Sequence, residues 1–509
     1  MPRRVLVTSL ALLSTACALG PNYKRPTAPV PTRFKEAAGE PAPAGAGWKT
    51  AEPKDGGDRG RWWEVFGDPA LNSLEEEVTV SNQSITQAEA QFRASRAGVR
   101  LARADLFPAA GVGANAGRSS GVTNRAAATP NGAPPAISSF AVSGDLSWVP
   151  DLFGRVRRTV EASVASAQAS AADLESVRLA MHAELAVDYF ALRGLDAEAR
   201  LLETTVKADE LALSITTNRY KQGVVSGVDV AQAETLLETT RAQAIDLQVA
   251  RAQVEHAIAV LVGRPPGDFS LPPEAVAVKP PPIPIVVASE LLERRPDLAV
   301  AERHVAAANA GIGVAKAAFF PTLALSASGG FQGSALSGLF SLPNRFWSLG
   351  AGLAETLFEG GQRRAASAQA VAAYDATVAA YRESVLGAFQ EVEDGLAALR
   401  ILAQEADQQA RAVAAAEHLL ALSKNRYQAG ITTYLEVVTA QSAALANERA
   451  AVQLLTRRMT ASVGLLGALG GGWRESDLPS RDAILVRVSA PATRAAPPAP
   501  PAGEAGSAP

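Results

Sequence analysis

The chain has 509 residues, a formal net charge of −3 at pH 7 and only 6 % aromatic residues. This small net charge gives no electrostatic reason to expect nucleic acid or another polyanion as a partner. Cys17 is the sole cysteine, which excludes an intramolecular disulfide framework. Abundant alanine and few aromatic residues favour closely packed helices over a thick globular core.

The first residues have the features of a bacterial secretion signal. Two arginines precede a short apolar stretch, and a small residue, Ala16, stands directly before Cys17. The apolar stretch is too short to span a bilayer as a helix. We predict a signal peptide over 1–16. Either Cys17 becomes a lipidated first residue, which we favour, or cleavage occurs without lipid.

Further along, the chain contains one unit twice. The sequence Asn-Arg-Tyr-Lys-Gln-Gly that ends at Gly223 returns as Asn-Arg-Tyr-Gln-Ala-Gly, which ends at Gly430. Units of this kind repeat because one copy cannot bury its apolar face alone. The prolines between the copies indicate a rigid linker, and the Ala/Pro-rich end indicates a disordered tail. We predict a lipid-anchored segment over 17–70, repeats over 71–275 and 289–470, a linker over 276–288 and a disordered tail over 471–509.

Each copy starts with a helix and then changes its apolar period to two, as in Phe140, Val142 and Leu146. We predict strands over 109–118, 138–149, 322–333 and 346–357. Each is close to the roughly 9–11 residues of a tilted transmembrane strand. A half-buried soluble sheet alternates in the same way, but the signal peptide favours a bacterial outer membrane.

Four strands cannot form a closed barrel. Open sheet edges are not tolerated in lipid, and single-chain barrels begin at about eight strands. We therefore expect an α+β membrane protein that oligomerises, with four strands from each subunit in one transmembrane β-barrel.

After the strands, each copy contains a proline-free stretch whose apolar residues recur in steps of three and four. This spacing is typical of supercoiled helices. We predict helices over 154–220, 228–263, 361–427 and 434–468. The two longer ones would each span roughly 100 Å, and Gly223 and Gly430 would reverse the chain between the members of each pair. A simple coiled-coil spacer would show the same pattern.

The sequence lacks a catalytic constellation. The four histidines stand on predicted helices without carboxylate or cysteine partners at ligand spacing, and we interpret them as packing or solvated residues: His182, His256, His304 and His418. No glycine-rich phosphate loop is present. We predict no enzymatic activity, no metal and no cofactor.

Several motifs together resemble the outer membrane factor family, the TolC/OprM-like exit ducts of tripartite efflux pumps, and within it the NodT-type lipoprotein branch. The two Arg-Tyr-x-x-Gly turns belong to this set, and its other members are the segment from Cys17 to Pro26, Asp151-Leu152-Phe153-Gly154-Arg155, Arg295-Pro296-Asp297-Leu298, Phe320-Pro321 and Leu357-Phe358-Glu359-Gly360-Gly361. The resemblance implies a homotrimer with a twelve-stranded barrel in outer-membrane lipid and a twelve-helix α-barrel in the periplasm. Its partners would be a periplasmic adaptor (membrane fusion protein) and an inner-membrane transporter.

The resemblance also implies a gate at the periplasmic tips of the helices. The tip turns would contain Arg219, Tyr220, Gly223, Arg426 and Gly430. Asp229 would link to Tyr427, Leu435 would form an apolar constriction and Glu436 an acidic ring. Thr432 stands where relatives often have an arginine, which argues against an ionic lock there. The tyrosines could instead cap coiled-coil packing, and the two acids also suit the first turn of a return helix.

The function that follows is a passive, gated exit duct for drugs or other small molecules. One alternative is the outer-membrane duct of a type I protein secretion system. A different class is a periplasmic coiled-coil adaptor or a structural lipoprotein, against which the four alternating strands argue. The sequence does not identify the substrate.

Overall fold

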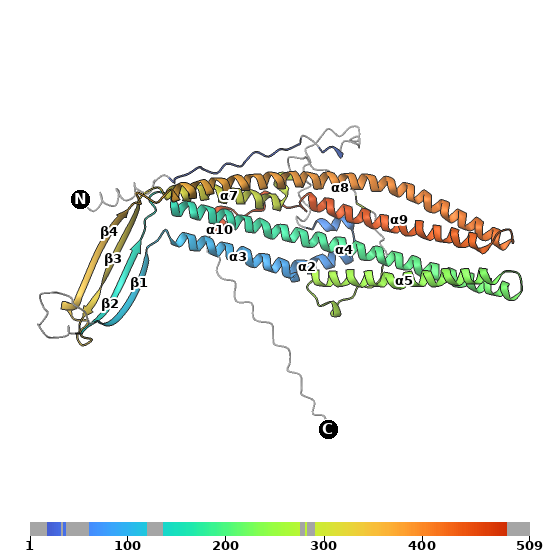
Figure 1. Ribbon diagram of the computed structural model, residues 1–509, viewed down its shortest axis with the longest axis horizontal. Helices are drawn as coiled ribbons and strands as arrows, with labels where there is room; N and C mark the ends of the chain where they lie inside the picture. Colours follow the sequence, from blue (N-terminus) through green and yellow to red (C-terminus); the bar gives the residue numbers. More distant parts are fainter. Residues whose placement is uncertain are drawn as a thin grey trace, which may run out of the picture.

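The computed structural model describes residues 18–31, 34–36, 61–119, 136–274, 280–281 and 291–485. Within these ranges the molecule is elongated, with a small sheet at one end and two helical hairpins at the other (Figure 1). Cys17 and the predicted signal peptide lie outside the described residues, and so does most of the predicted linker.

The sheet contains four described strands, which pair antiparallel in sequence order. They are β1 (Ala109–Ser119), β2 (Ile137–Trp148), β3 (Thr322–Gly333) and β4 (Arg345–Ala354). The predicted 346–357 is wrong at its end, because β4 stops at Ala354. Beyond it Arg363 contacts the Glu355 and Glu359 carboxylates and the Thr356 carbonyl, so these residues turn toward α8 instead of pairing with β3.

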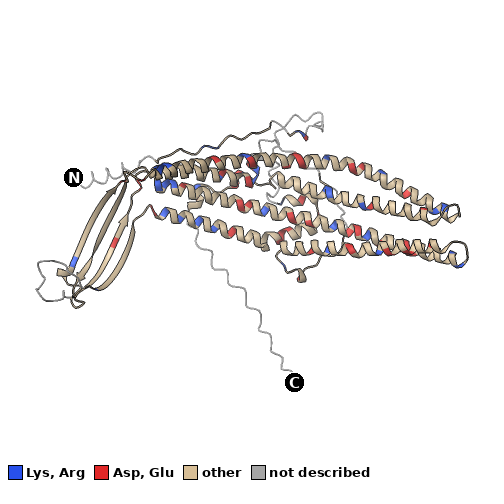
Figure 2. Ribbon diagram, in the orientation of Figure 1, with Lys and Arg blue, Asp and Glu red and all other residues tan. Residues whose placement is uncertain are grey.

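The register gives the sheet two different faces. Gly111 pairs with Asp145, Asp145 with Ser328 and Ser328 with Ser348, so these small and polar residues share one face. The other face is apolar and exposed: Val112 is 85 % and Leu349 75 % accessible. Figure 2 shows few charges on the sheet and many along the helices. The apolar face is suited to lipid.

The helices fall into two groups that follow the duplication. The first copy holds α2 (Pro69–Ser81), α3 (Gln83–Ala104), α4 (Arg155–Lys221) and α5 (Gly227–Leu261), and the second holds α7 (Pro296–Ala317), α8 (Gln362–Gln428) and α9 (Tyr434–Ala468). Asn82 separates α2 from α3, a break that the apolar pattern did not reveal. Its side chain accepts a hydrogen bond from the Ile85 amide (3.1 Å) and donates to the Leu261 carbonyl (2.8 Å).

The α4 helix lies at the centre and packs against α3, α5, α7 and α9. Its apolar seam is buried at Val160, Val164, Leu185 and Leu192. The close approach of α9 depends on Gly194, because a Cβ at that position would lie 2.2 Å from Thr456 Oγ1.

The N-terminal residues 18–31 and 34–36 lie against the outside of the helical body. Arg158 donates to the Leu19 and Gly20 carbonyls (2.9 and 3.3 Å), and Asn309 donates to the Pro21 carbonyl (3.0 Å). Farther along, the buried Phe34 ring packs on Phe389. This segment therefore runs beside α7 and α8, from the sheet end toward the middle of the molecule (Figure 1).

The prediction of a disordered tail over 471–509 is wrong for 471–485. This part ends in α10 (Arg481–Leu485). Ile484 is 2 % accessible and packs in one cluster with Val99 and Val156, so it fills an apolar gap between α3 and α4. Residues 486–509 lie outside the described ranges.

His182 is a buried packing residue, as predicted, but it also has a carboxylate partner from another helix. Its Nδ1 lies 2.6 Å from Glu75 Oε2, and the Trp63 ring stacks on the imidazole at 4.5 Å between centroids. Burial raises the pKa of Glu75 to about 9 and lowers the pKa of His182 to about 4. Both groups are therefore neutral near pH 7, and the protonated Glu75 donates to His182.

These shifts predict a loss of stability toward alkaline pH. Above pH 6.5 the folded protein keeps a proton on Glu75 that the unfolded chain has released, so stability falls until the pH reaches about 9. Each pH unit in this window costs up to about 1.4 kcal/mol. Below pH 6.5 the depressed pKa of His182 acts in the opposite sense, and the two effects cancel down to pH 4.5.

Glu75→Gln should remove the alkaline loss, because its amide can still donate to His182 but does not titrate. Thermal unfolding in detergent should show the stability of the variant relative to wild type rising steadily from about pH 4.5 to about pH 9, because only the wild type must take up a proton on Glu75 when it folds. Glu76→Gln, at an exposed neighbouring position, is the control. Equal pH dependence in wild type and Glu75→Gln would contradict the protonated state of this pair.

Candidate functional site

Both hairpins end in turns of the same geometry. Gly223 and Gly430 have φ values of 75° and 72°, in the left-handed region that favours glycine. In each turn the next amide bonds back across it, from Val224 to the Arg219 carbonyl (2.9 Å) and from Ile431 to the Arg426 carbonyl (3.0 Å). The duplicated turn sequence therefore encodes a duplicated helix reversal.

The acids of the two tips bind within their own hairpins. Asp229 Oδ2 accepts hydrogen bonds from the Ser226 amide (3.0 Å) and hydroxyl (3.1 Å), which caps α5. Glu436, the matching residue of the second copy, accepts from Arg426 Nη1 (2.8 Å) and from the Thr432 hydroxyl. The negative charge of Glu436 is thus offset by a cation of the same tip. Leu435 is 54 % accessible in the single chain.

The expected link between Asp229 and Tyr427 is not formed within the chain. Asp229 serves the cap, and the buried Tyr427 hydroxyl has no hydrogen-bond partner among the described residues. The Tyr427 ring instead packs edge-on against Tyr434, with centroids 5.2 Å apart.

The two tip tyrosines differ because their surroundings differ. Tyr220 is 51 % accessible and faces Gly227, whereas Tyr427 is buried and faces Tyr434, the residue that matches Gly227 in the second copy. The loss of the aromatic partner at Gly227 was visible in the sequence. Tyr427 could have been distinguished from Tyr220 by this signal.

Arg219 joins the first hairpin to the second. Its guanidinium carbon lies 4.8 Å from the centre of the Tyr427 ring, and Nη1 donates to the Tyr427 carbonyl at 3.4 Å. A guanidinium over an aromatic face is attracted by the ring quadrupole. The sequence placed Arg219 in a tip turn but gave no indication of this cross-hairpin role.

A second contact between the hairpins lies farther from the tips, at Asp209 on α4. This carboxylate is 2 % accessible and accepts hydrogen bonds from Thr240 Oγ1 on α5 (2.9 Å) and from Gln441 Nε2 on α9. Burial raises the pKa of Asp209, although its two donors and the nearby Lys424 oppose the shift. The sequence analysis missed Asp209, because its partners lie far away along the chain.

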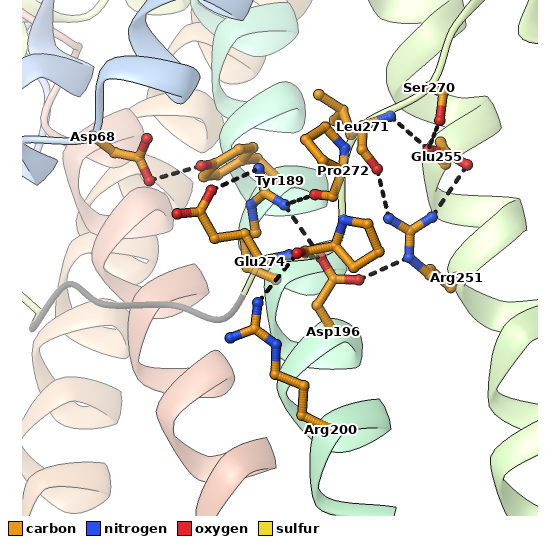
Figure 3. A network of polar contacts seen from close by, with 12 residues as sticks. Asp68, Tyr189, Asp196, Arg200, Arg251, Glu255, Ser270, Leu271, Pro272 and Glu274 are labelled. Atoms are coloured by element: carbon orange, nitrogen blue, oxygen red, sulfur yellow. Dashed lines mark hydrogen bonds and ion pairs between the residues drawn. The ribbon is translucent and has the colours of Figure 1, made fainter. Parts of the chain in front are cut away.

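A larger polar network fastens the segment after α5 to the helices (Figure 3). Asp196 accepts from Arg251 Nε (2.7 Å), from Arg193 Nη1 (3.2 Å) and from the Glu274 amide (3.0 Å). Arg193 also donates to the Pro272 carbonyl (2.8 Å). These bonds tie the segment after α5 to α4 and α5, so the network holds the middle of the molecule together.

No group of three or more histidine, cysteine, aspartate or glutamate residues in the described ranges could hold a metal ion. Nor is any described helix both long and apolar enough to cross a membrane.

Comparison with known proteins supports the channel architecture. The family model described as outer membrane efflux protein matches residues 74–264 and 287–471, one match in each copy of the duplicated unit. The probable efflux pump outer membrane protein TtgC of Pseudomonas putida is 32 % identical over 468 residues, 91 % of this chain and 94 % of that protein. The outer membrane protein OprJ of Pseudomonas aeruginosa is 32 % identical over 474 residues, 92 % and 95 % of the two chains.

Solved structures agree with this match. The outer-membrane channel OprN superposes with a TM-score of 0.79 at 29 % identity, over 90 % of this chain and all of that one. The open state of the Neisseria gonorrhoeae channel MtrE gives 0.76 at 28 % identity, over 90 % and 99 % of the two chains. With its duplicated hairpins, two-faced sheet and these relatives, the chain belongs to the outer membrane efflux protein family and is an outer-membrane channel component of an efflux pump.

Proposed function

We propose that three copies of this chain assemble into a gated exit duct for drugs or other small molecules. The observation that carries this proposal is the sheet, whose outer edges, β1 and β4, have no partner strand among the described residues. Three such sheets supply the twelve strands of a closed barrel, and closure satisfies the edge groups. The polar face with Asp145 and Ser328 would line the lumen, and the apolar face with Val112 and Leu349 would meet lipid.

The long hairpins would continue the duct away from the membrane, toward a periplasmic adaptor and an inner-membrane transporter. Both α4 and α8 have 67 residues, roughly 100 Å at about 1.5 Å per residue. A duct of this kind performs no chemistry. The transporter would supply the energy, and the duct would supply a path and a closure.

We also propose that Cys17 carries the lipid anchor. Supporting this, Ala18 lies against Gly154, just before α4 begins: a Cβ at Gly154 would be 2.7 Å from Ala18 Cα. Ala18 therefore lies where the helices meet the strands, which in the proposed barrel would be the level of the membrane surface. Mass spectrometry of the membrane-extracted protein tests the proposal, and an unmodified Cys17 would refute it.

Deletion of the gene should increase the intracellular accumulation of a fluorescent efflux substrate, and a plasmid copy should reverse the effect. The physical reason is that the pump would lose this path across the outer membrane. Accumulation assays with and without an uncoupler separate active efflux from changes in permeability. The proposal fails if deletion alters secretion of a protein but not the accumulation of any small molecule.

The gate proposal places Leu435 on the duct axis as an apolar constriction, with Glu436 beside it. In planar bilayers Leu435→Ser should increase conductance, because a polar side chain lowers the barrier to water and ions. Glu436→Gln should shift selectivity toward anions, since it leaves the Arg426 charge unpaired. Glu405→Gln is the control, because Glu405 is exposed, pairs with Arg457 and lies 23 residues before the end of α8. Unchanged conductance and selectivity in both tip variants would place the constriction elsewhere.

A further inference from the structure

The two hairpins of one chain meet through a small set of contacts near their tips. Besides Arg219 and Tyr427, the contacts include Asp209, whose carboxylate bridges α4, α5 and α9 through Thr240 and Gln441. Asp209 lies twelve residues before the end of α4 at Lys221, roughly 18 Å back from the tip at about 1.5 Å per residue.

The contact at Asp209 is polar but incompletely satisfied. Burial without a hydrogen-bonded cation disfavours the charged form of Asp209. Four buried polar atoms on helix turns near the tips have no hydrogen-bond partner: Gln232 Oε1, Ser423 Oγ, Tyr427 Oη and Gln441 Oε1. Half of the unpaired buried side-chain atoms found among the described residues therefore lie on these tip-proximal turns. A buried donor or acceptor without a partner is costly, and water can satisfy it once the surface opens.

The apolar part of the same contact is small. The cluster of buried residues there consists of Ala233, Tyr427, Tyr434 and Val437. Nearer the middle of the molecule, α4 contributes Leu185, Tyr189, Phe190 and Leu192 to a much larger cluster. The apolar contact between the two hairpins is therefore large at the middle of the molecule and small near the tips. The tips can separate at a lower cost than the middle.

The second copy of the unit does not repeat this polar contact. Ala416 occupies the position that matches Asp209, and Asn447 the position that matches Thr240. The contact of Asp209 with Thr240 is thus not part of the packing that is repeated inside each hairpin. Asp209 serves the junction between the two copies, whereas Asp229 only caps its own helix.

We infer that Asp209, through Thr240 and Gln441, acts beside the Arg219–Tyr427 contact to hold the first hairpin against the second in the closed duct, and that opening requires the bonds of Asp209 to break. This inference rests on the proposed gated duct. When the hairpins separate, the Asp209 carboxylate and the unpaired Tyr427 Oη and Gln441 Oε1 atoms would gain access to water, which offsets the bonds lost. The contact can therefore be strong enough to keep the duct closed at rest and still yield to a partner that binds the hairpins.

The first test compares Asp209→Ala with Glu210→Ala in the full-length protein in planar bilayers. Asp209→Ala removes both bonds and should increase the time-averaged conductance severalfold. It should also sensitise cells to bulky antibiotics that the wild type excludes. Glu210 is the next residue, is exposed and pairs with Arg241, so its variant is a matched control that should behave like wild type. Equal conductance of Asp209→Ala and wild type would overturn the inference.

A second test does not depend on how well Asp209→Ala folds. In the double variant Asp209→Cys/Gln441→Cys, bridging the two introduced side chains with a short, reducible thiol cross-linker should abolish export, and reduction should restore it. Unaffected export after complete cross-linking would show that the hairpins do not separate here. If the wild type itself neither conducts nor exports, the proposed duct fails. If the wild type exports normally and both Asp209 tests are negative, only this inference fails.

Discussion

The edges of the sheet impose the constraint on which the rest of the architecture depends. In lipid, each backbone donor and acceptor on β1 and β4 without a partner costs several kcal/mol, and the chain itself provides no further described strand to cover them. The apolar face, with Val112 and Leu349 largely exposed, has the same requirement for a non-aqueous environment. One chain satisfies neither requirement alone. In the proposed assembly around an axis, neighbouring chains would pair the strand edges, lipid around the barrel would cover the apolar face, and the attached helices would form a ring.

The two hairpins arise from the duplicated sequence, and the contacts of the proposed gate involve residues that differ between the two copies. The turns at Gly223 and Gly430 are equivalent in backbone geometry. Their side chains are not: Gly227 in one copy matches Tyr434 in the other, so only Tyr427 is buried on an aromatic partner and receives Arg219 across the junction. If the two hairpins had identical tip residues, Tyr220 and Tyr427 would have the same surroundings. Because they differ, Arg219 of the first hairpin binds the buried Tyr427 of the second.

Local patterns predicted the elements well, because heptad spacing and turn glycines act within a few residues of each other. The long helices begin and end within one residue of the expected 154–220 and 361–427. The errors arose where residues far apart in the sequence determine the local structure. The end of β4 depends on Arg363, and the order of 471–485 depends on a gap that Ile484 fills. Asp209 was missed for the same reason, since Gln441 belongs to the other copy.

The mass of the assembled particle tests the central claim most directly. Native mass spectrometry of the detergent-extracted protein, combined with circular dichroism, reports subunit number and strand content in one sample. The account predicts three chains in each particle with the strand content retained, because only closure satisfies the edges of β1 and β4. A stable monomer that keeps its full strand content in detergent would contradict it.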